Sequence, residues 1–447
     1  MPEPFKDLTN NVDFSKHGKS GPVNVSFNNK TIGDGNREFL AACNSAGIPT
    51  VPDYNATESH LGAALLQWSH ASGVRNSSSF CFLDDGKRPS NLTLQTNTEV
   101  LRIEFEGTRA VGVVVKDADG KESQLRAAQE VIISAGSIGT PRLLQLSGVG
   151  DQEHLKKVGV KPVAHVPAVG EGLQDHMMLN LMWRVPDSVE TFDKMFHDHD
   201  TLMAAVGQYQ ADQSGPLAAI ASGTVAHVQD ESLLKTDAFA KLPKQSQDHI
   251  RDSTRAHYQI VKNNTFYTKD VVGSPDGPHI ATACWLLNLQ SSGSVKITSS
   301  DPSAKPEVTV NYLSNPFDRE VAKAAVRKCM QIGTSPAWKE FGAKLAFGPK
   351  GDTEADLDKF VVDEAFQGVH TVGTSRIGKS TAPDLSVHPP APHGSVVDSD
   401  LNVFGTQGLR VVDASVIPFP TSAGPQATVY AHGVIAAQKI AAAAGSA

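Results

Sequence analysis

The sequence predicts an α/β protein with mixed α+β character, in which a partial doubly wound domain is joined to a second domain with an antiparallel sheet and helices. Two strand–glycine–helix units, at residues 130–146 and 409–444, indicate the first domain, because such units build doubly wound sheets. The stretch between them, residues 177–345, contains no such unit. A chain of 447 residues also exceeds the length at which one hydrophobic core stops growing, which favours two domains.

The residues before the first unit predict an arm, a helix and an antiparallel excursion, which is a set of antiparallel strands. Residues 1–35 are typical of an arm with a strand-like patch at 23–27, and residues 37–46 have the apolar spacing of a helix that ends at Gly47. Apolar residues alternate or cluster over 92–105 and 110–115, and residues 117–121 supply a turn. We therefore expect an antiparallel excursion over residues 92–121.

The two units have clear local signals. EVIISA at 130–135 suits a strand buried on both faces, Gly136 ends it, and a helix is expected over 141–146 with Pro141 in its first turn. In the second unit, LRVVD at 409–413 predicts a strand, and an Ala-rich helix is expected over 425–444. Both strands should belong to one sheet.

The middle stretch predicts a separate, substrate-facing domain. A long polar segment at 187–270 precedes a strand pair near 283–289 and 295–297, and an amphipathic helix is expected near 318–332. Large aromatic side chains in this stretch could line a substrate pocket, although such side chains are more often part of a core. They are Trp183, Phe266, Tyr267, Trp285 and Trp338.

The charge and hydropathy of the chain exclude two kinds of partner. The formal net charge of -8 provides no basic field for a phosphate backbone, and no apolar run is long enough to span a membrane. We expect neither nucleic acid nor a membrane as partner. The start, MPEPFKDLTNN, lacks the charged end and apolar core of a signal peptide, so the location stays open between the cytoplasm and a secreted full-length parent. An excess of Asn-X-Ser/Thr sites suits such a parent, at Asn24, Asn29, Asn55, Asn76, Asn91 and Asn263.

Metal and nucleophile signals are weak. The four cysteines have neither CxxC nor metal-finger spacing, so buried thiols or one or two structural bridges are expected. The string HDHD at 197–200 could chelate a metal, but a solvated turn is the stronger interpretation. No metal site is predicted, and the absence of Gly-X-Ser-X-Gly weighs against a hydrolase.

One string in the first unit is long and specific, GSIGTPRLLQLSGVG at 136–150. Further strings follow it along the chain: VGEGLQDH at 169–176, GSV at 293–295, NY at 311–312, HTVGT at 370–374 and LRVVDAS at 409–415. In this order they resemble the glucose-methanol-choline (GMC) flavin oxidoreductases over about residues 20–445. The resemblance implies FAD as cofactor and an enzyme acting on CH–OH donors.

The resemblance also implies domain boundaries. Residues 1–92 would form an N-terminal arm with a partial FAD-domain and lid segment, and residues 177–345 the substrate-binding domain. Residues 93–176 and 360–447 would be segments of the FAD-binding domain, the second of which carries the catalytic histidine.

The resemblance implies flavin contacts at Val100, Ala135, Gly136, Asp413, Ala414 and Gln426. Gly136 lets the backbone approach a bulky ligand, although a tight turn between strand and helix would explain it too. Asp413, at the end of a strand, is placed to hydrogen-bond ribityl or phosphate-linked hydroxyls, and the alternative is a helix or turn cap. Val100 taken alone would be a core residue.

His370 is the candidate catalytic base. Oxidation of an alcohol requires removal of the hydroxyl proton as hydride leaves carbon, and histidine has an ordinary pKa near 6.5 that suits this task. A single histidine is usually structural, but the family string His-X-X-Gly-Thr implies the catalytic function here. The helix that begins near residue 425 would direct partial positive charge toward the flavin.

Gly424 departs from the family pattern. The resemblance places a second catalytic His or Asn at this position, and glycine has no side chain to hydrogen-bond the substrate oxygen. A neighbour such as Thr421, Ser422 or Gln426 could substitute for it. The loss also makes an alternative function conceivable, a non-redox cyclase or a binding protein that uses the same pocket.

The nucleotide-binding fingerprint of the family is a second departure. No Gly-X-Gly-X-X-Gly string occurs in the 447 residues, and we expect the chain to lack the N-terminal unit that holds the flavin pyrophosphate. An incomplete gene product, a partner chain that supplies the unit, or a shortened relative that no longer binds flavin would each explain this. The prediction for function is FAD-dependent oxidation of a small, primary or secondary alcohol, conceivably aromatic or a secondary metabolite.

Overall fold

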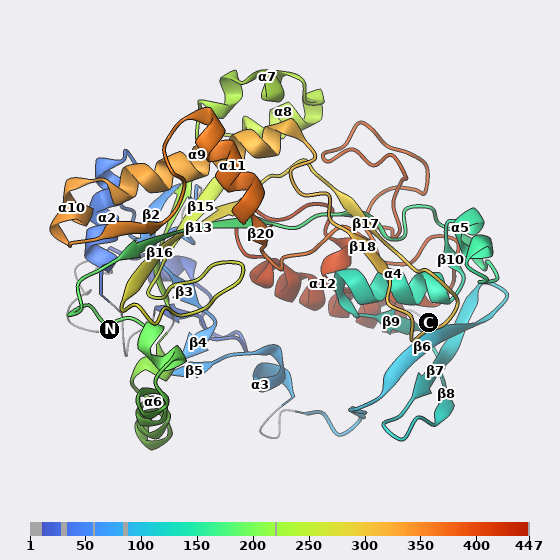
Figure 1. Cartoon of the computed structure of the whole chain (residues 1–447). Coiled ribbons are helices and arrows are strands. Elements are labelled where there is room, and N and C mark those ends of the chain that lie inside the picture. Colours follow the sequence, from blue (N-terminus) through green and yellow to red (C-terminus); the bar gives the residue numbers. More distant parts are fainter. Residues whose placement is uncertain (1–10, 28–33, 57–58, 84–87, 220, 446–447) are drawn as a thin grey trace.

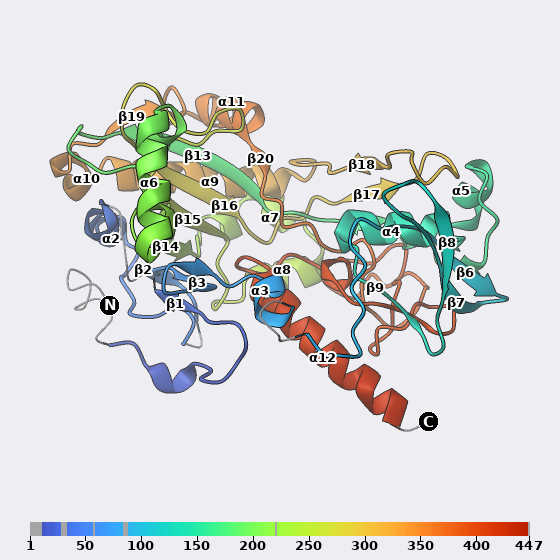
Figure 2. The same ribbon diagram turned by 90° about the horizontal axis from the view of Figure 1, so that it is seen from below.

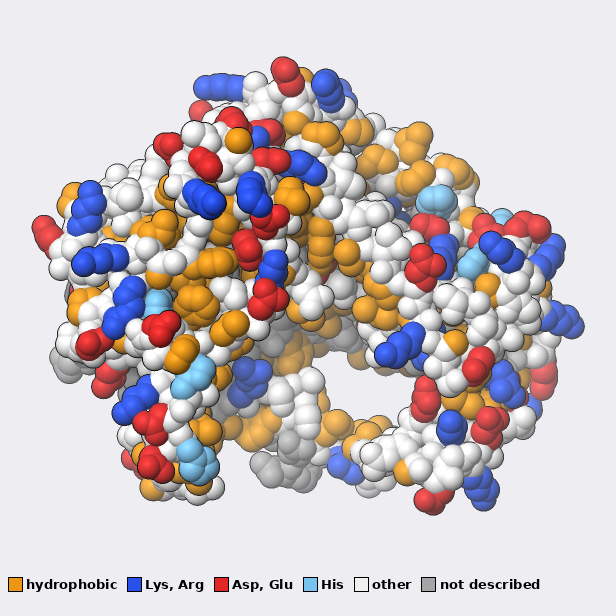
Figure 3. All heavy atoms as spheres, in the orientation of Figure 1, with side chains coloured by type: hydrophobic (Ala, Val, Ile, Leu, Met, Phe, Trp, Pro, Cys, Tyr) orange, Lys and Arg blue, Asp and Glu red, His pale blue; other side chains and the backbone are white. Residues whose placement is uncertain are grey.

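The computed structural model describes residues 11–27, 34–56, 59–83, 88–219 and 221–445. Figure 1 shows two regions, one built around a large antiparallel sheet and one around shorter strands with helices α4 and α12. Figure 3 shows an opening between these two regions. The predicted combination of a mixed α/β chain, an antiparallel sheet and helices is confirmed.

The large sheet has seven strands, and every pairing in it is antiparallel. The order is β19-β13-β16-β15-β14-β2, and β20 also pairs with β13. Strands β13 and β16 are buried along almost their whole length, because both faces of the sheet are covered. The strands are β2 (Gly62–Leu65), β13 (Met177–Arg184), β14 (Ser222–Val228), β15 (Tyr258–Asn263), β16 (His279–Leu286), β19 (Lys344–Phe347) and β20 (Phe366–Gln367).

Helices cover one face of this sheet (Figures 1 and 2). The central one is α9 (Pro316–Gly333), whose first turn is capped by Asn315 and whose apolar side packs on β13, β15 and β16. The others nearby are α2 (Asn36–Ser45), α7 (Asp237–Ala240), α8 (Lys244–Ile250), α10 (Pro336–Glu340) and α11 (Glu354–Glu364). The predicted helices at 37–46 and 318–332 are confirmed with shifted ends.

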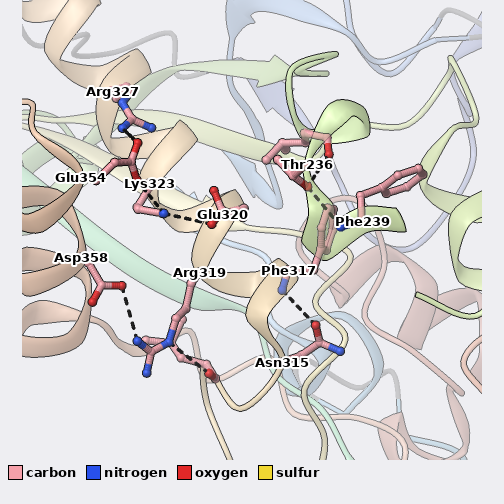
Figure 4. Close-up of polar contacts among 12 residues, drawn as sticks. Thr236, Phe239, Asn315, Phe317, Arg319, Glu320, Lys323, Arg327, Glu354 and Asp358 are labelled. Carbon is pink, nitrogen blue, oxygen red and sulfur yellow. Dashed lines mark hydrogen bonds and ion pairs between the residues drawn. The ribbon is translucent and has the colours of Figure 1, made fainter. Parts of the chain in front are cut away.

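Ion pairs on the polar side of α9 connect it to α11 (Figure 4). Lys323 Nζ lies 2.8 Å from Glu354 Oε2, and Arg319 Nη1 lies 3.4 Å from Asp358 Oδ1. Such partly exposed pairs contribute about 0–1 kcal/mol each to stability. Their main effect is to orient α11 against α9.

The polar segment at 187–270 supplies two central strands of the sheet, β14 and β15, which its composition did not predict. Both strands are buried, and several of their polar side chains have hydrogen-bond partners inside the protein. Thr224 Oγ1 donates to Asn36 Oδ1, and Lys262 Nζ donates to the Asp34 carbonyl oxygen at 2.5 Å and to Asn36 Oδ1 at 3.1 Å. The segment also contains α6 (His199–Asp212), whose N-cap is Asp198, so the HDHD string lies at the start of a helix rather than in a solvated turn.

Lys262 should make stability depend on pH. Burial lowers the pKa of Lys262 to about 7, and the nearby carboxylates of Asp34 and Glu38 offset this only in part. Above that pH the folded protein has released the proton, while the unfolded chain holds it up to its ordinary value of 10.5. The free energy of unfolding should therefore rise with pH in this window, by up to about 1.4 kcal/mol per pH unit.

Urea unfolding of wild type and Lys262→Met at pH values between about 7 and about 10 measures this slope. The variant should show a flatter rise than wild type. Lys350→Met is the control, because Lys350 is exposed and should leave the slope unchanged. Equal slopes for wild type and Lys262→Met would contradict the prediction.

The second region contains both predicted strand–glycine–helix units. β9 (Val131–Ile133) leads into α4 (Gly136–Leu146), and β21 (Leu409–Val411) leads through a loop to α12 (Gln426–Gly445). The two strands pair in parallel, as expected for one sheet. The predicted antiparallel excursion is confirmed as the sheet β6 (Glu99–Glu106), β7 (Arg109–Lys116) and β8 (Glu122–Arg126).

Helix α4 begins earlier than predicted, so Pro141 lies inside it rather than in its first turn. A proline inside a helix leaves the carbonyl oxygen four residues earlier without its usual donor. Here that oxygen belongs to Ser137, and it accepts a hydrogen bond from Thr374 Oγ1 at 2.7 Å. The proline is tolerated because a residue far along the chain supplies the missing donor.

Shorter elements complete the described chain. Strand β12 pairs with β17 and β17 with β18, and β10 pairs in parallel with β11. These short strands and helices are β1 (Ser26–Phe27), β3 (Gln67–Trp68), β4 (His70–Ala71), β5 (Val74–Arg75), α3 (Ser78–Phe82), β10 (Val149–Gly150), α5 (Gln152–Lys157), β11 (Ala164–His165), β12 (Glu171–Leu173), β17 (Gly293–Lys296) and β18 (Glu307–Thr309).

The large sheet uses more of the chain than the predicted substrate-binding stretch, residues 177–345. Strand β2 and helix α2 come from the segment before residue 92, and β20 and α11 from the segment after residue 345. The remaining domain boundaries stay a prediction.

The smaller sequence signals have mixed outcomes. All four cysteines are buried free thiols, and the described residues contain no cluster suited to a metal ion. Of the predicted glycosylation sites, Asn76 is buried and therefore inaccessible in this fold, and Asn29 lies outside the described residues. Within the described ranges, no helix combines the length and the apolar character needed to cross a membrane.

Candidate functional site

His370 lies in the loop after β20, where the two regions meet. The Asp175 carboxylate holds this loop, because Oδ1 accepts the His370 backbone N–H at 2.6 Å and Oδ2 accepts that of Val369 at 3.2 Å. Tyr312 donates its hydroxyl to Asp175 Oδ2 at 2.6 Å. Val369 adopts a left-handed conformation with φ of 61°, which is unusual for a β-branched residue and requires such support.

The His370 ring is held between two aromatic groups. It stacks on Trp285 of β16 with ring centroids 4.7 Å apart and planes at 26°, and it meets His176 edge to face. His370 Nδ1 and His176 Nδ1 are 2.9 Å apart. Burial lowers the pKa of His370, and the Asp175 carboxylate opposes this only in part. The imidazole is therefore neutral at neutral pH, which is the state that can accept a proton.

The first turn of α4 also fixes the His370 loop. Ser137 Oγ donates to the Thr371 carbonyl oxygen at 2.6 Å, in addition to the bond from Thr374 to Ser137 described above. Gly373 lies so close to Gly172 that a Cβ on it would be 2.3 Å from the Gly172 carbonyl oxygen. The glycine of the HTVGT string is thus required by backbone contact.

Gly424 lies directly beside His370. A Cβ at this position would be 3.8 Å from His370 Cε1 and 4.0 Å from His370 Nε2, an ordinary contact distance. Two of the three side chains proposed to substitute for the missing partner have other contacts, since Thr421 Oγ1 donates to the Ala423 carbonyl oxygen and Gln426 Oε1 accepts from Ser69 Oγ. The role of position 424 as a lost second catalytic residue stays a prediction.

Four of the six candidate flavin contacts lie together at the ends of β9 and β21. Asp413 Oδ2 accepts hydrogen bonds from Gly136 N at 2.9 Å and Thr140 Oγ1 at 2.5 Å, and Oδ1 caps the short turn at Ala414–Val416 by accepting from Ser415 N. Ala135 precedes Gly136 as the N-cap residue of α4. The carboxylate therefore joins the two units, so the cap interpretation and the flavin interpretation of Asp413 are compatible.

The other two candidates flank this group. Val100 lies on β6, which packs against α4, and it is 38% exposed rather than part of the core. Gln426 is the first residue of α12. The roles of all six as cofactor contacts stay predictions.

The space beside Asp413 suits a polar ligand. Gly136 has φ of 78° and no atom within 4 Å of a Cβ built on it. Ser415 Oγ and His432 Nε2 are buried without a hydrogen-bond partner in the described part of the chain, and His432 is close enough for the Asp413 carboxylate to affect its pKa. Buried polar atoms without partners are costly, so these residues fit a bound polar group such as a flavin nucleotide.

A pocket of about 380 Å³ lies elsewhere, between the 389–394 loop and the turn at 290–294. Gln174 lines it, but His370 and Gly424 do not. The candidate chemistry is therefore not in this pocket.

Sequence reasoning missed three residues of the site. Asp175 and His176 belong to the VGEGLQDH string, which was used only as a family signal, and Tyr312 to the NY string. Among the large aromatics, Trp285 lies at the site, whereas Trp183 and Trp338 are buried in the main core. Nothing in the local sequence distinguishes Trp285 from the other two.

Two strand–glycine–helix units beside a half-buried histidine are typical of an α/β oxidoreductase with a nucleotide cofactor. Two models described as GMC oxidoreductase match the chain, one over residues 4–178 and one over 290–433. The chain belongs to the GMC oxidoreductase family, and FAD is the cofactor that this membership assigns. Because the N-terminal model matches from residue 4, the expectation that the family's N-terminal unit is lacking is not borne out, nor is a partner chain that supplies it.

The named relatives include two dehydrogenases and a synthase. The chain is 30% identical over 95% of its length to dehydrogenase eriK of Hericium erinaceus and 29% identical over 95% to an oxygen-dependent choline dehydrogenase of Chromohalobacter salexigens, and it spans 70% of each. It is 32% identical over 79% of its length to versicolorin B synthase of Aspergillus parasiticus, of which it spans 52%. Dehydrogenases predominate among these names, so the non-redox alternative is not favoured.

Solved structures agree on the fold. A formate oxidase aligns with a TM-score of 0.82 and 25% identity, covering 95% of this chain and 73% of the other. A fungal aryl-alcohol oxidase aligns with a TM-score of 0.79 and 23% identity, covering 98% and 76%.

Proposed function

We propose that this protein oxidises a neutral, aromatic or largely apolar alcohol and that His370 accepts the hydroxyl proton. The observation that carries the proposal is His370 itself, a neutral imidazole that is held by Asp175, His176 and Trp285 and that has Gly424, which lacks a side chain, beside it. Bound FAD supplies the chemistry of hydride acceptance. Ala135, Gly136 and Asp413 would hold it on the β9–β21 side, with Val100 and Gln426 as flanking contacts.

The sheet face beside His370 indicates the substrate class. Trp285 lies opposite Met178 on β13 and opposite Gln259 on β15, so these three side chains share one face. The same row continues to His227 on β14 and to Phe366 on β20. Burial lowers the pKa of His227 to about 3, so the whole row is uncharged at neutral pH.

The next row across the sheet is also uncharged. Asn180, Ala283, Val261 and Val225 lie opposite one another on β13, β16, β15 and β14. Most of these side chains are buried in one cluster, whereas Trp285 is partly exposed and stacks on His370. The absence of charge in both rows favours a neutral substrate with a ring or chain that packs on Trp285. A quaternary ammonium such as choline could contact aromatic side chains here, but neither row contains a carboxylate to balance its charge.

A substrate panel tests this proposal. FAD-loaded protein should be reduced by neutral aryl alcohols with a kcat/KM up to about 10-fold above that for choline, because one desolvated aromatic contact contributes about 0.5–1.5 kcal/mol beyond its buried area. Trp285→Leu should lower kcat/KM for the aryl alcohol about 10-fold, whereas Trp285→Phe should retain most of it. Preference for choline, or an equal loss in both variants, would contradict the proposed substrate class.

A further inference from the structure

His176 lies between His370 and the loop that precedes α12. Its Nδ1 is 2.9 Å from His370 Nδ1, and its Nε2 is 2.9 Å from the Thr421 carbonyl oxygen. The two rings meet at 83°, and the side chain is fully enclosed, with only 1% of the residue exposed. Each ring nitrogen of His176 therefore has one defined partner.

These contacts have one consistent arrangement of hydrogens. A carbonyl oxygen only accepts hydrogen bonds, so His176 Nε2 must carry a hydrogen and donate it to Thr421. A neutral His176 then has a bare Nδ1, which accepts. His370 must donate to it through its own Nδ1–H, and this leaves His370 Nε2 without a hydrogen.

The reverse arrangement would need a doubly protonated His176 that donates to His370. Burial, and secondarily the neighbouring His370, lower the pKa of His176 to about 3. At neutral pH the cationic form is therefore scarcely populated, and the arrangement with a bare His370 Nε2 remains.

We propose that His176 is a positioning residue that fixes His370 in the Nδ1–H tautomer, so that Nε2 is the atom that accepts the substrate proton. The proposal rests on the proposed function of His370. Nε2 is also the ring nitrogen that faces Gly424, since it lies 4.0 Å from the Cβ position there. When Nε2 accepts the proton, His370 becomes a cation that still donates through Nδ1, and the nearby Asp175 carboxylate favours that charge.

Nitrogen-15 NMR of the FAD-loaded, ¹⁵N-histidine-labelled protein tests the tautomer without reference to activity. The His370 signals are assigned by their loss in His370→Ala. Wild type should show a hydrogen on His370 Nδ1 and none on Nε2. His176→Leu removes the acceptor, so both tautomers of His370 should appear, whereas His176→Asn should retain the wild-type tautomer because its carbonyl oxygen can accept in place of Nδ1.

The kinetics of the same variants separate positioning from a merely structural role. His176→Leu should lower kcat for flavin reduction at least about 10-fold with little change in KM, since a wrongly held tautomer impairs proton transfer rather than binding. His176→Asn should recover most of this loss. Equal losses in two folded variants would overturn the proposal.

A bare His370 Nδ1 in wild type would also overturn it, and this measurement decides the matter even if His176→Leu fails to fold. Failure of the proposed function looks different. In that case His370→Ala would keep normal flavin reduction, whatever tautomer the wild-type spectrum shows.

Discussion

Replacing His370 with alanine should slow reduction of bound FAD by an alcohol substrate at least about 100-fold. The variant lacks the group that removes the hydroxyl proton as hydride leaves carbon. Flavin binding should persist, because the candidate flavin contacts at Gly136 and Asp413 are held by other residues. Anaerobic stopped-flow measurement of FAD bleaching gives the rate constant directly.

His393→Ala is the matched control, because His393 is an exposed histidine in the 389–394 loop. It should leave the rate of bleaching unchanged. Near-normal bleaching in His370→Ala would show that another group takes the proton.

The pH dependence of flavin reduction should show in which direction the pKa of His370 is shifted. Only neutral His370 can accept a proton, and burial lowers its pKa below the ordinary value of 6.5. The rate of flavin reduction should therefore rise with pH through a midpoint below 6.5 and be level at neutral pH. A midpoint above 6.5 would indicate that the environment of His370 favours its charged form.

Replacing Asp193 with alanine should destabilise the protein by roughly 3 kcal/mol or more, because each buried donor left without a partner costs about 1–3 kcal/mol. Asp193 is 1% exposed. Its carboxylate accepts the backbone N–H groups of Phe266 at 2.8 Å, Ser274 at 3.0 Å and His279 at 2.8 Å. These hydrogen bonds hold the loop that leads into β16, the strand that carries Trp285.

Urea unfolding followed by tryptophan fluorescence measures the loss. Asp193→Asn is the control, since its amide keeps one oxygen acceptor and should cost less than the alanine variant. A loss below about 1 kcal/mol for Asp193→Ala would show that water or a rearranged loop satisfies the three donors.

The sequence was most informative where structure is local. The strands at 131–133 and 409–411 and their helices follow from short apolar runs, glycine turns and helical composition, all of which act between near neighbours. The start of α4 was wrong by five residues because the donor that makes Pro141 tolerable inside the helix comes from Thr374. A contact of this kind has no local signal.

The strands in the polar segment at 187–270 were not predicted for the same reason, because they depend on contacts with residues distant in the sequence. Composition suggested no buried strand there, yet β14 and β15 lie in the middle of the sheet. The buried Lys262 is stabilised by oxygens of Asp34 and Asn36, which are more than 200 positions away in the sequence. Burial of a polar side chain depends on such partners, and only the folded chain provides them.

The sequence by itself determined the family strings, their order and the choice of His370 over the other histidines. Only the tertiary structure decided what surrounds that histidine. Asp175 and His176 come from the loop before β13, and Trp285 comes from β16. Their hydrogen bonds and stacking join them to His370 over 85 to 195 positions of the sequence. The ring nitrogen of His370 that carries the hydrogen is decided by its contact with His176, which is 194 positions away in the sequence. No local pattern of residues encodes such a contact.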